Sequence, residues 1–170
     1  MRRVLVLEDE ELLLAVLNSS PADGDRRREE LAGDAGARLA QRFGGTGSAA
    51  EIARLRRVRD ALQRVVGGDV RAVGELAALA EGVALAPEVE ASGLRWRLTA
   101  PADEHLAARV LVAWSEVQRA LPNRLRACAN AECNLFLIDH SRPGTAKWCS
   151  MATCGNRMKA RAHAQRARRG

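Results

Sequence analysis

The sequence is poor in aromatic residues and in long apolar runs. It has no tyrosine, and Phe and Trp make up only 3% of its 170 residues, so aliphatic side chains must build any core. Its 47% hydrophobic content is enough for that. No apolar run approaches the ~20 residues that a membrane span needs, and acidic residues 8–11 interrupt the apolar start before the ~7–15 residues of a signal peptide. We therefore expect a cytoplasmic protein without membrane contact.

Lysine is scarce throughout, and acidic residues are scarce in the last third of the chain. The chain has two lysines, Lys147 and Lys159, and 25 arginines. Residues 1–118 carry 16 basic and 19 acidic side chains, a net charge of −3. Residues 119–170 carry 11 basic side chains and only Glu132 and Asp139 as acids, a net charge of +9. This asymmetry is typical of a polyanion-binding module beside a nearly neutral domain.

The first two thirds of the chain predict a mostly α domain with a small β-hairpin, an α+β fold. Hydrophobic periodicity indicates helices over 9–17, 49–66 and 103–121, and Asp69 is placed to cap another that runs to about 82. The alanine-rich and charged stretch 25–43, whose periodicity is weaker, is also expected to be helical. A strand is expected at 4–7. Alternation predicts a half-buried hairpin formed by 83–90 and 94–99. The side chains expected to face inward on the helix after Asp69 are Val73, Leu76, Ala77 and Ala80.

No catalytic set stands out in this domain. Trp96 and Trp114 fall in register with aliphatic positions, so both are expected to be packing residues. The glycine-rich segment 44–48 lacks the Lys-Ser/Thr ending of a phosphate-binding loop. We therefore expect a protein that is not an enzyme.

All four cysteines lie in the last third, at Cys128, Cys133, Cys149 and Cys154, with the spacing C-x4-C-x15-C-x4-C. Two short-range pairs joined by a longer loop can supply the four tetrahedral thiolates of a structural zinc site. The alternatives are a disulfide pair, ordinary buried thiols or an iron–sulfur cluster. A short strand is expected between the pairs at 135–138, and Trp148 is placed to cover one face of the metal site.

After the last cysteine the sequence predicts a strongly basic helix over 151–169. Arg157, Arg161 and Arg168 fall on one stripe of this helix, while Lys159, His163 and Arg166 fall on the opposite side. Such a helix has little to pack against and is available to a phosphate backbone or a groove. The alternative is a solvated tail that is basic for solubility.

The stretch Arg124 to His163, which includes Cys154-Gly155-Asn156-Arg157, resembles the CGNR zinc-finger family. The resemblance implies a bacterial stress-induced transcriptional regulator in which the four cysteines hold zinc. It also implies an N-terminal ABATE domain, here residues 1–121, followed by the finger at 122–170. Residues 12–19, Leu-Leu-Leu-Ala-Val-Leu-Asn-Ser, loosely resemble the start of an ABATE domain.

Three residues of the signature have expected roles. The Gly155 amide is expected to donate to a thiolate sulfur, and Asn156 is expected to cap or bond a turn. Arg157 is expected either to contact DNA or to pin the finger to the N-terminal domain through a carboxylate.

These observations favour a DNA-binding regulator associated with the nucleoid. The candidate contact residues are Arg157, Lys159, Arg161, Arg166 and Arg168. The N-terminal domain would form a homodimer or sense a signal such as a small-molecule effector, and a dimer is expected because one small finger reads few bases. The alternative is a module in which the finger binds RNA or protein and the N-terminal domain binds a ligand or partner. A redox-sensitive zinc site is a further alternative.

Overall fold

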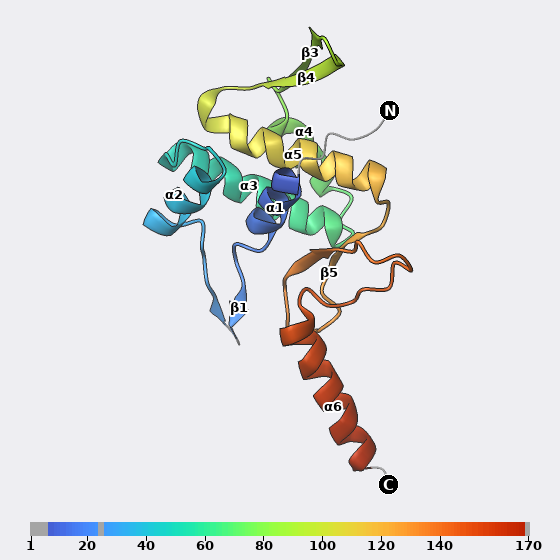
Figure 1. Ribbon diagram of the computed structural model, residues 1–170. Helices are drawn as coiled ribbons and strands as arrows, with labels where there is room; N and C mark the ends of the chain where they lie inside the picture. The colour runs from blue at the N-terminus through green and yellow to red at the C-terminus, as the bar shows by residue number, and fades with distance from the viewer. Residues whose placement is uncertain (1–6, 24–25, 169–170) are drawn as a thin grey trace.

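The computed structural model describes residues 7–23 and 26–168 and confirms the α+β fold (Figure 1). The expected strand at 4–7 lies outside the described residues except for Leu7, which begins a helix. Within residues 7–23 and 26–168, no helix is both long and apolar enough to cross a membrane. The helices are α1 (Leu7–Leu17), α2 (Gly33–Arg42), α3 (Ala49–Val66), α4 (Ala72–Leu79), α5 (Ala102–Ala120) and α6 (Asn156–Ala167).

Three two-stranded antiparallel sheets complete the described part of the chain. The first pairs β1 (Ala22–Asp23) with β2 (Arg26–Arg27), and the second pairs β3 (Ala84–Glu90) with β4 (Gly93–Thr99). The third pairs β5 (Leu125–Ala127) with β6 (Phe136–Ile138). These sheets lie around the helices rather than forming a central layer (Figure 1).

The core forms where α1, α3 and α5 pack against one another. Helix α3 begins at Ala49 because the Ser48 side chain accepts a hydrogen bond from the Glu51 amide at 3.0 Å, and it ends at Gly67. Its apolar residues recur at helical spacing, so one face of α3 is buried. The fully buried aliphatic side chains include Leu12, Leu13, Leu55, Leu62, Leu106 and Val110.

Two predictions about the helices were wrong. The helix expected over 25–43 begins only at Gly33, because the chain first forms the β1–β2 pair and an extended segment. The buried face of α4 consists of Ala72, Leu76 and Leu79, whereas Val73 is 48% exposed. The helix starts at Ala72 and its inward face is one position out of register with the expected one, so Leu76 alone was assigned correctly.

The predicted hairpin forms, but it is not half-buried. It projects from the helical body at the end opposite α6 (Figure 1). Trp96 is 50% exposed, so its assignment to the core was wrong. Trp114 is partly buried against the core, as predicted.

A buried arginine stabilises the segment that follows α1. Arg59, on α3, is only 4% exposed and binds both carboxylate oxygens of Glu29 at 2.7 and 2.8 Å. The same guanidinium donates to the Ser19 hydroxyl and to Asp60. Burial alone would raise the pKa of Glu29, but Arg59, the Leu31 amide and the charge of Arg56 together outweigh it, so the pKa is lowered. This network is the reason that an arginine is tolerated inside the helical body.

Two asparagine side chains that bond to backbone groups, together with a common hydrophobic core, join the cysteine-rich segment to the helical body. The Asn18 side chain donates to the Phe136 carbonyl at 3.1 Å and accepts from the Phe136 amide at 2.7 Å, so it acts as a strand partner for β6. Asn134 makes a matching pair of bonds, to the Ser20 carbonyl and the Ala22 amide. Leu125, Phe136 and Ile138 belong to the same apolar cluster as α1, α3 and α5. Helical body and cysteine-rich segment therefore have one continuous core.

We predict that Asn18→Ala lowers the free energy of unfolding by about 1–3 kcal/mol, because it removes two hydrogen bonds from the buried edge of β6. Urea unfolding of the zinc-loaded chain measures this. Gln165→Ala, on exposed α6, is the control and should change the free energy by less than about 0.5 kcal/mol. Equal unfolding midpoints for the two variants would show that Asn18 does not join the segments.

Candidate metal centre

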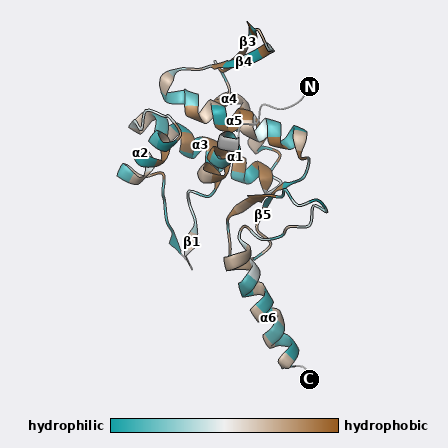
Figure 2. Ribbon diagram, viewed as in Figure 1, coloured by the Kyte–Doolittle hydropathy of each residue, from teal (hydrophilic) through white to brown (hydrophobic). Residues whose placement is uncertain are grey.

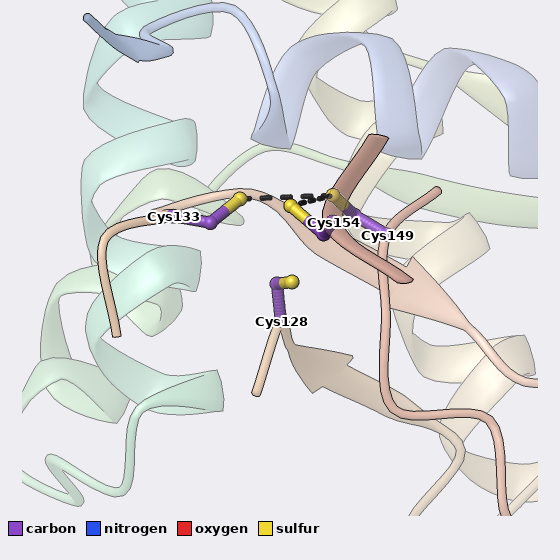
Figure 3. A group of neighbouring side chains, drawn as sticks. All are labelled: Cys128, Cys133, Cys149 and Cys154. Carbon is purple, nitrogen blue, oxygen red and sulfur yellow. Dashed lines mark hydrogen bonds between the residues drawn. The ribbon is translucent and has the colours of Figure 1, made fainter. Parts of the chain in front are cut away.

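The four cysteine side chains converge on one point (Figure 3). Their sulfur atoms all lie within 4.8 Å of one another, and none is in a disulfide. Cys128 and Cys154 are buried, while Cys133 and Cys149 are partly exposed. Within the described residues, one side of the cluster is therefore enclosed by protein, and the other side lies near solvent.

Local backbone bonds position each thiol. Cys128 follows β5 directly, and its amide donates to the Leu135 carbonyl at 2.8 Å, which extends the β5–β6 pairing. The Cys133 amide donates to the Asn130 carbonyl at 2.8 Å and closes a turn. Cys154 lies in η1 (Met151–Gly155), a π-helical turn that begins at Ser150 and leads into α6. The wider π turn carries Cys154 back toward Cys149 before the α-helix starts.

The separations fit a tetrahedral zinc ion. The sulfurs of Cys133 and Cys149 are 3.6 Å apart, and those of Cys149 and Cys154 are 3.7 Å apart. Zinc–sulfur bonds of ~2.3 Å in a tetrahedron place neighbouring sulfurs ~3.8 Å apart, whereas a disulfide needs ~2.05 Å. Four thiolates would fill the coordination sphere, so the site suits structural zinc.

Asn130 supports the cluster, and the sequence pattern did not single it out. The side chain is 1% exposed, and its Nδ2 donates to the Cys154 sulfur at 3.6 Å. Its Oδ1 accepts from the Glu132 amide at 3.4 Å, which keeps the donor end turned toward sulfur. A buried amide donor offsets part of the negative charge of the thiolates. Its position two residues after the first cysteine is the signal that could have identified it.

The surroundings also shift the thiol pKa values of the metal-free chain. Burial raises the pKa of both Cys133 and Cys149, and for Cys149 the neighbouring thiols raise it further. Burial alone would also raise the pKa of Cys154, but the hydrogen bonds from Asn130 and the other thiols outweigh it and lower the pKa. At neutral pH, Cys133 and Cys149 are therefore protonated until metal binds.

Asp139 fixes the long loop between the two cysteine pairs. Its carboxylate is buried and accepts from the amides of Ser141 at 2.8 Å and Ala146 at 3.0 Å. Arg124 and Arg126, on or beside β5, form ion pairs with it. The Ser141 hydrogen bonds come first among the contacts that lower the pKa of Asp139 to about 2, against the opposing effect of burial. The carboxylate therefore stays ionised at neutral pH, and the stability that its contacts give the loop is lost as the pH falls toward 2.

The signature residues lie on η1 and the start of α6. A Cβ atom on Gly155 would come within 2.9 Å of the Met151 side chain and 3.2 Å of Trp148, so the glycine permits close packing there. Its amide donates to the Ser150 carbonyl at 3.0 Å, so the expected amide-to-sulfur bond was wrong. Asn156 Nδ2 donates to the Ala152 carbonyl at 3.2 Å, which is a turn bond of the expected kind.

The candidate nucleic-acid contacts lie together on α6 and its C-cap, and all five are exposed. Arg161 is already engaged, because its guanidinium binds both carboxylate oxygens of Glu132 at 2.6 Å. This bond ties α6 to the turn between Cys128 and Cys133. An ion pair between Arg157 and a carboxylate of the helical body was one of the two expected roles. The ion pair that forms is made by Arg161 instead, and its partner Glu132 lies between the first two cysteines.

The geometry defines a small module with a four-thiolate structural metal site. Residues 124–167 match the family model described as CGNR zinc finger, a span of about a quarter of the chain. This match supports both the zinc-finger assignment and zinc as the metal. No curated protein matches the chain. The ABATE assignment of residues 1–121 and the boundary after Leu121 stay predictions.

We predict that zinc affinity rises with pH between pH 6 and pH 8. Zinc must displace protons at least from Cys133 and Cys149, whose pKa values are raised, so the logarithm of the binding constant should increase by about two or more per pH unit. Competition with a chromophoric chelator measures the constant, and calorimetry in buffers of different ionisation enthalpy counts the protons. A constant independent of pH would contradict protonated thiols in the metal-free site.

We further predict that Asn130→Ala weakens zinc binding by about 10–100-fold, because it removes the amide donor to Cys154. Asn156→Ala is the matched control, since Asn156 donates to a backbone carbonyl rather than to sulfur. Chelator competition at constant pH compares the two. Equal loss of affinity in both variants would mean that Asn130 acts only through the fold of the module.

Proposed function

We propose that this chain is a zinc-dependent DNA-binding protein, a bacterial transcriptional regulator whose finger presents α6 to DNA. The observation that carries the proposal is the exposure of this basic helix. None of the residues of α6 is buried, and its principal contact within the described chain is η1, which precedes it. The helix extends away from the helical body (Figure 1).

The dimensions of α6 suit a DNA groove. Twelve residues make a rod of about 18 Å, and the major groove is ~12 Å wide, enough to admit one α-helix. The ribbon alternates between hydrophilic and weakly apolar residues along its length (Figure 2). Small alanines between the charged side chains let the helix approach a phosphate backbone closely.

The charge of the helix favours a polyanion. Five basic side chains lie between 157 and 168, and no acidic residue follows Asp139. Because Glu132 occupies Arg161, the proposed phosphate contacts fall to Arg157 and Arg168 on one stripe and to Lys159 and Arg166 on the other. In the described part of the chain, neither Lys159 nor Arg166 has an ion-pair partner.

The zinc site has a supporting rather than a chemical role in this proposal. Four thiolates leave zinc without a position for water, so the metal folds the module and orients α6. We assign the helical body to signal sensing or dimerisation, and we assign no catalytic activity. The protein would then act on DNA in the nucleoid.

The direct test is selection of bound sequences from a random duplex DNA pool, with and without a zinc chelator. Enrichment that disappears with the chelator supports the proposal. Enrichment that persists without zinc contradicts the role of the finger. No enrichment of duplex DNA, together with tight binding to structured RNA, would move the function to RNA recognition.

We predict that Lys159→Ala with Arg166→Ala weakens duplex binding and lowers the slope of log K against log[salt] by about two, because each phosphate contact contributes about one. Fluorescence anisotropy at several salt concentrations measures both quantities. Arg57→Ala with Arg71→Ala removes the same charge from exposed positions on the helical body and should leave the slope unchanged.

A second variant tests the same surface in the opposite direction. Glu132→Gln releases Arg161 and removes a negative charge beside α6, so duplex binding should strengthen and the salt slope should increase.

If the α6 double variant and the control double variant lose affinity equally, α6 is not the contact surface.

A further inference from the structure

The projecting β3–β4 hairpin has two chemically different faces. Residues directly opposite one another in an antiparallel pair share a face, and the pairing is Leu85 with Leu98, Pro87 with Trp96, and Val89 with Leu94. One face is therefore entirely apolar. The other face carries Glu88, Glu90, Arg95 and Arg97, joined by ion pairs of 2.5–2.7 Å.

The apolar face is open to solvent. Val89 is 86% exposed, Leu94 64%, Trp96 50% and Leu85 47%. An isolated two-stranded hairpin is marginally stable in water, and its usual stabilisation is packing of the apolar face against another element. Here the structure places that face where no described element covers it. A contiguous exposed patch of this kind marks an interaction surface.

An apolar groove continues this face onto the helical body. It lies between α4 and α5, has a volume of about 470 Å³, and shares Leu85 with the hairpin. Val73, which is 48% exposed, lies on the α4 side of the groove, and Trp114 lies on the α5 side. The chain thus carries a projecting apolar strip and a concave apolar groove side by side.

We propose that a second copy of this chain covers this surface, with the hairpin face of each copy over the α4–α5 groove of the other. The exposed apolar side chains amount to roughly 500–600 Å² per copy, so a dimer would bury about 1,000–1,200 Å², the lower limit of a specific interface. The two acidic and two basic residues of the hairpin lie on its other face and cancel, so two copies approach through the apolar face without net repulsion from the hairpins. A charged partner would gain nothing from this neutral strip.

Symmetry also favours a second copy of the chain as the partner that covers this surface. Because one chain supplies both the strip and the groove, two identical contacts form around a two-fold axis and the assembly closes at two copies. An interface at this lower limit belongs to the size class of weak assemblies, so we expect the dimer to dissociate on dilution. The dimer does not depend on DNA binding, so it stands or falls separately from the proposed function.

Sedimentation equilibrium of the zinc-loaded chain without DNA, over about 1–200 µM, tests the dimer. The mass should rise from the 18.4 kDa of one chain to twice that value. Trp96→Asp and Leu94→Asp place a charge on the apolar face and should give a monomer at every concentration. Thr99→Asp places the same charge on the opposite face and should dimerise like the unmodified chain.

A photo-crosslinker locates the contact. p-Benzoylphenylalanine at position 94 should join to residues 73–85 or 111–115 of an isotope-labelled second copy. A monomer at all concentrations overturns the proposal and leaves the surface to a different partner. A dimer that survives Trp96→Asp, or crosslinks that fall on the zinc finger, overturns it as well.

Discussion

Four sulfur atoms held within 4.8 Å of one another are the constraint on which the last third of the chain depends. Four thiolates at this distance repel one another strongly unless a cation lies between them. The strands that deliver them, β5 and β6, have three residues each, too few to bury much surface. Metal binding therefore has to supply a large part of the folding free energy of this segment. The amide of Asn130 reduces the remaining charge at Cys154.

The zinc segment also relies on the helical body. Asn18 pairs with the free edge of β6, Asn134 ties the segment before β6 to Ser20 and Ala22, and Phe136 packs into the apolar core. Because that core includes residues of α1 and α3, loss of zinc should also lower the stability of the helical body. In the other direction, the pair formed by Arg161 and Glu132 couples the zinc site to α6. The helix is thus presented by a connected structure rather than by an unattached tail.

The sequence predicted what depends on local periodicity and missed what depends on distant partners. Helix α3 and the hairpin followed from spacing, and the metal ligands followed from cysteine pairs. Alternation correctly showed that Trp96 lies on an apolar face, but it cannot show whether another element covers that face. From the sequence alone, Asp139 is only one of two acidic residues in a basic segment. Its structural role could not be predicted, because that role requires Arg124, Arg126 and the loop amides to come together in the fold. Strand β2 falls inside the stretch 25–43 that was predicted to be helical from its composition, and pairing with β1 decides its structure instead.

The placement of the hairpin constrains how a dimer could meet DNA. The β3–β4 hairpin and α6 lie at opposite ends of the molecule (Figure 1). A two-fold contact through the hairpins therefore directs the two basic helices away from each other. Half-sites read by conventional dimers lie one helical turn apart, about 34–36 Å, which requires recognition helices close to the two-fold axis. A dimer joined at the hairpins would instead hold two separated DNA segments, and each finger would bind through its own phosphate contacts.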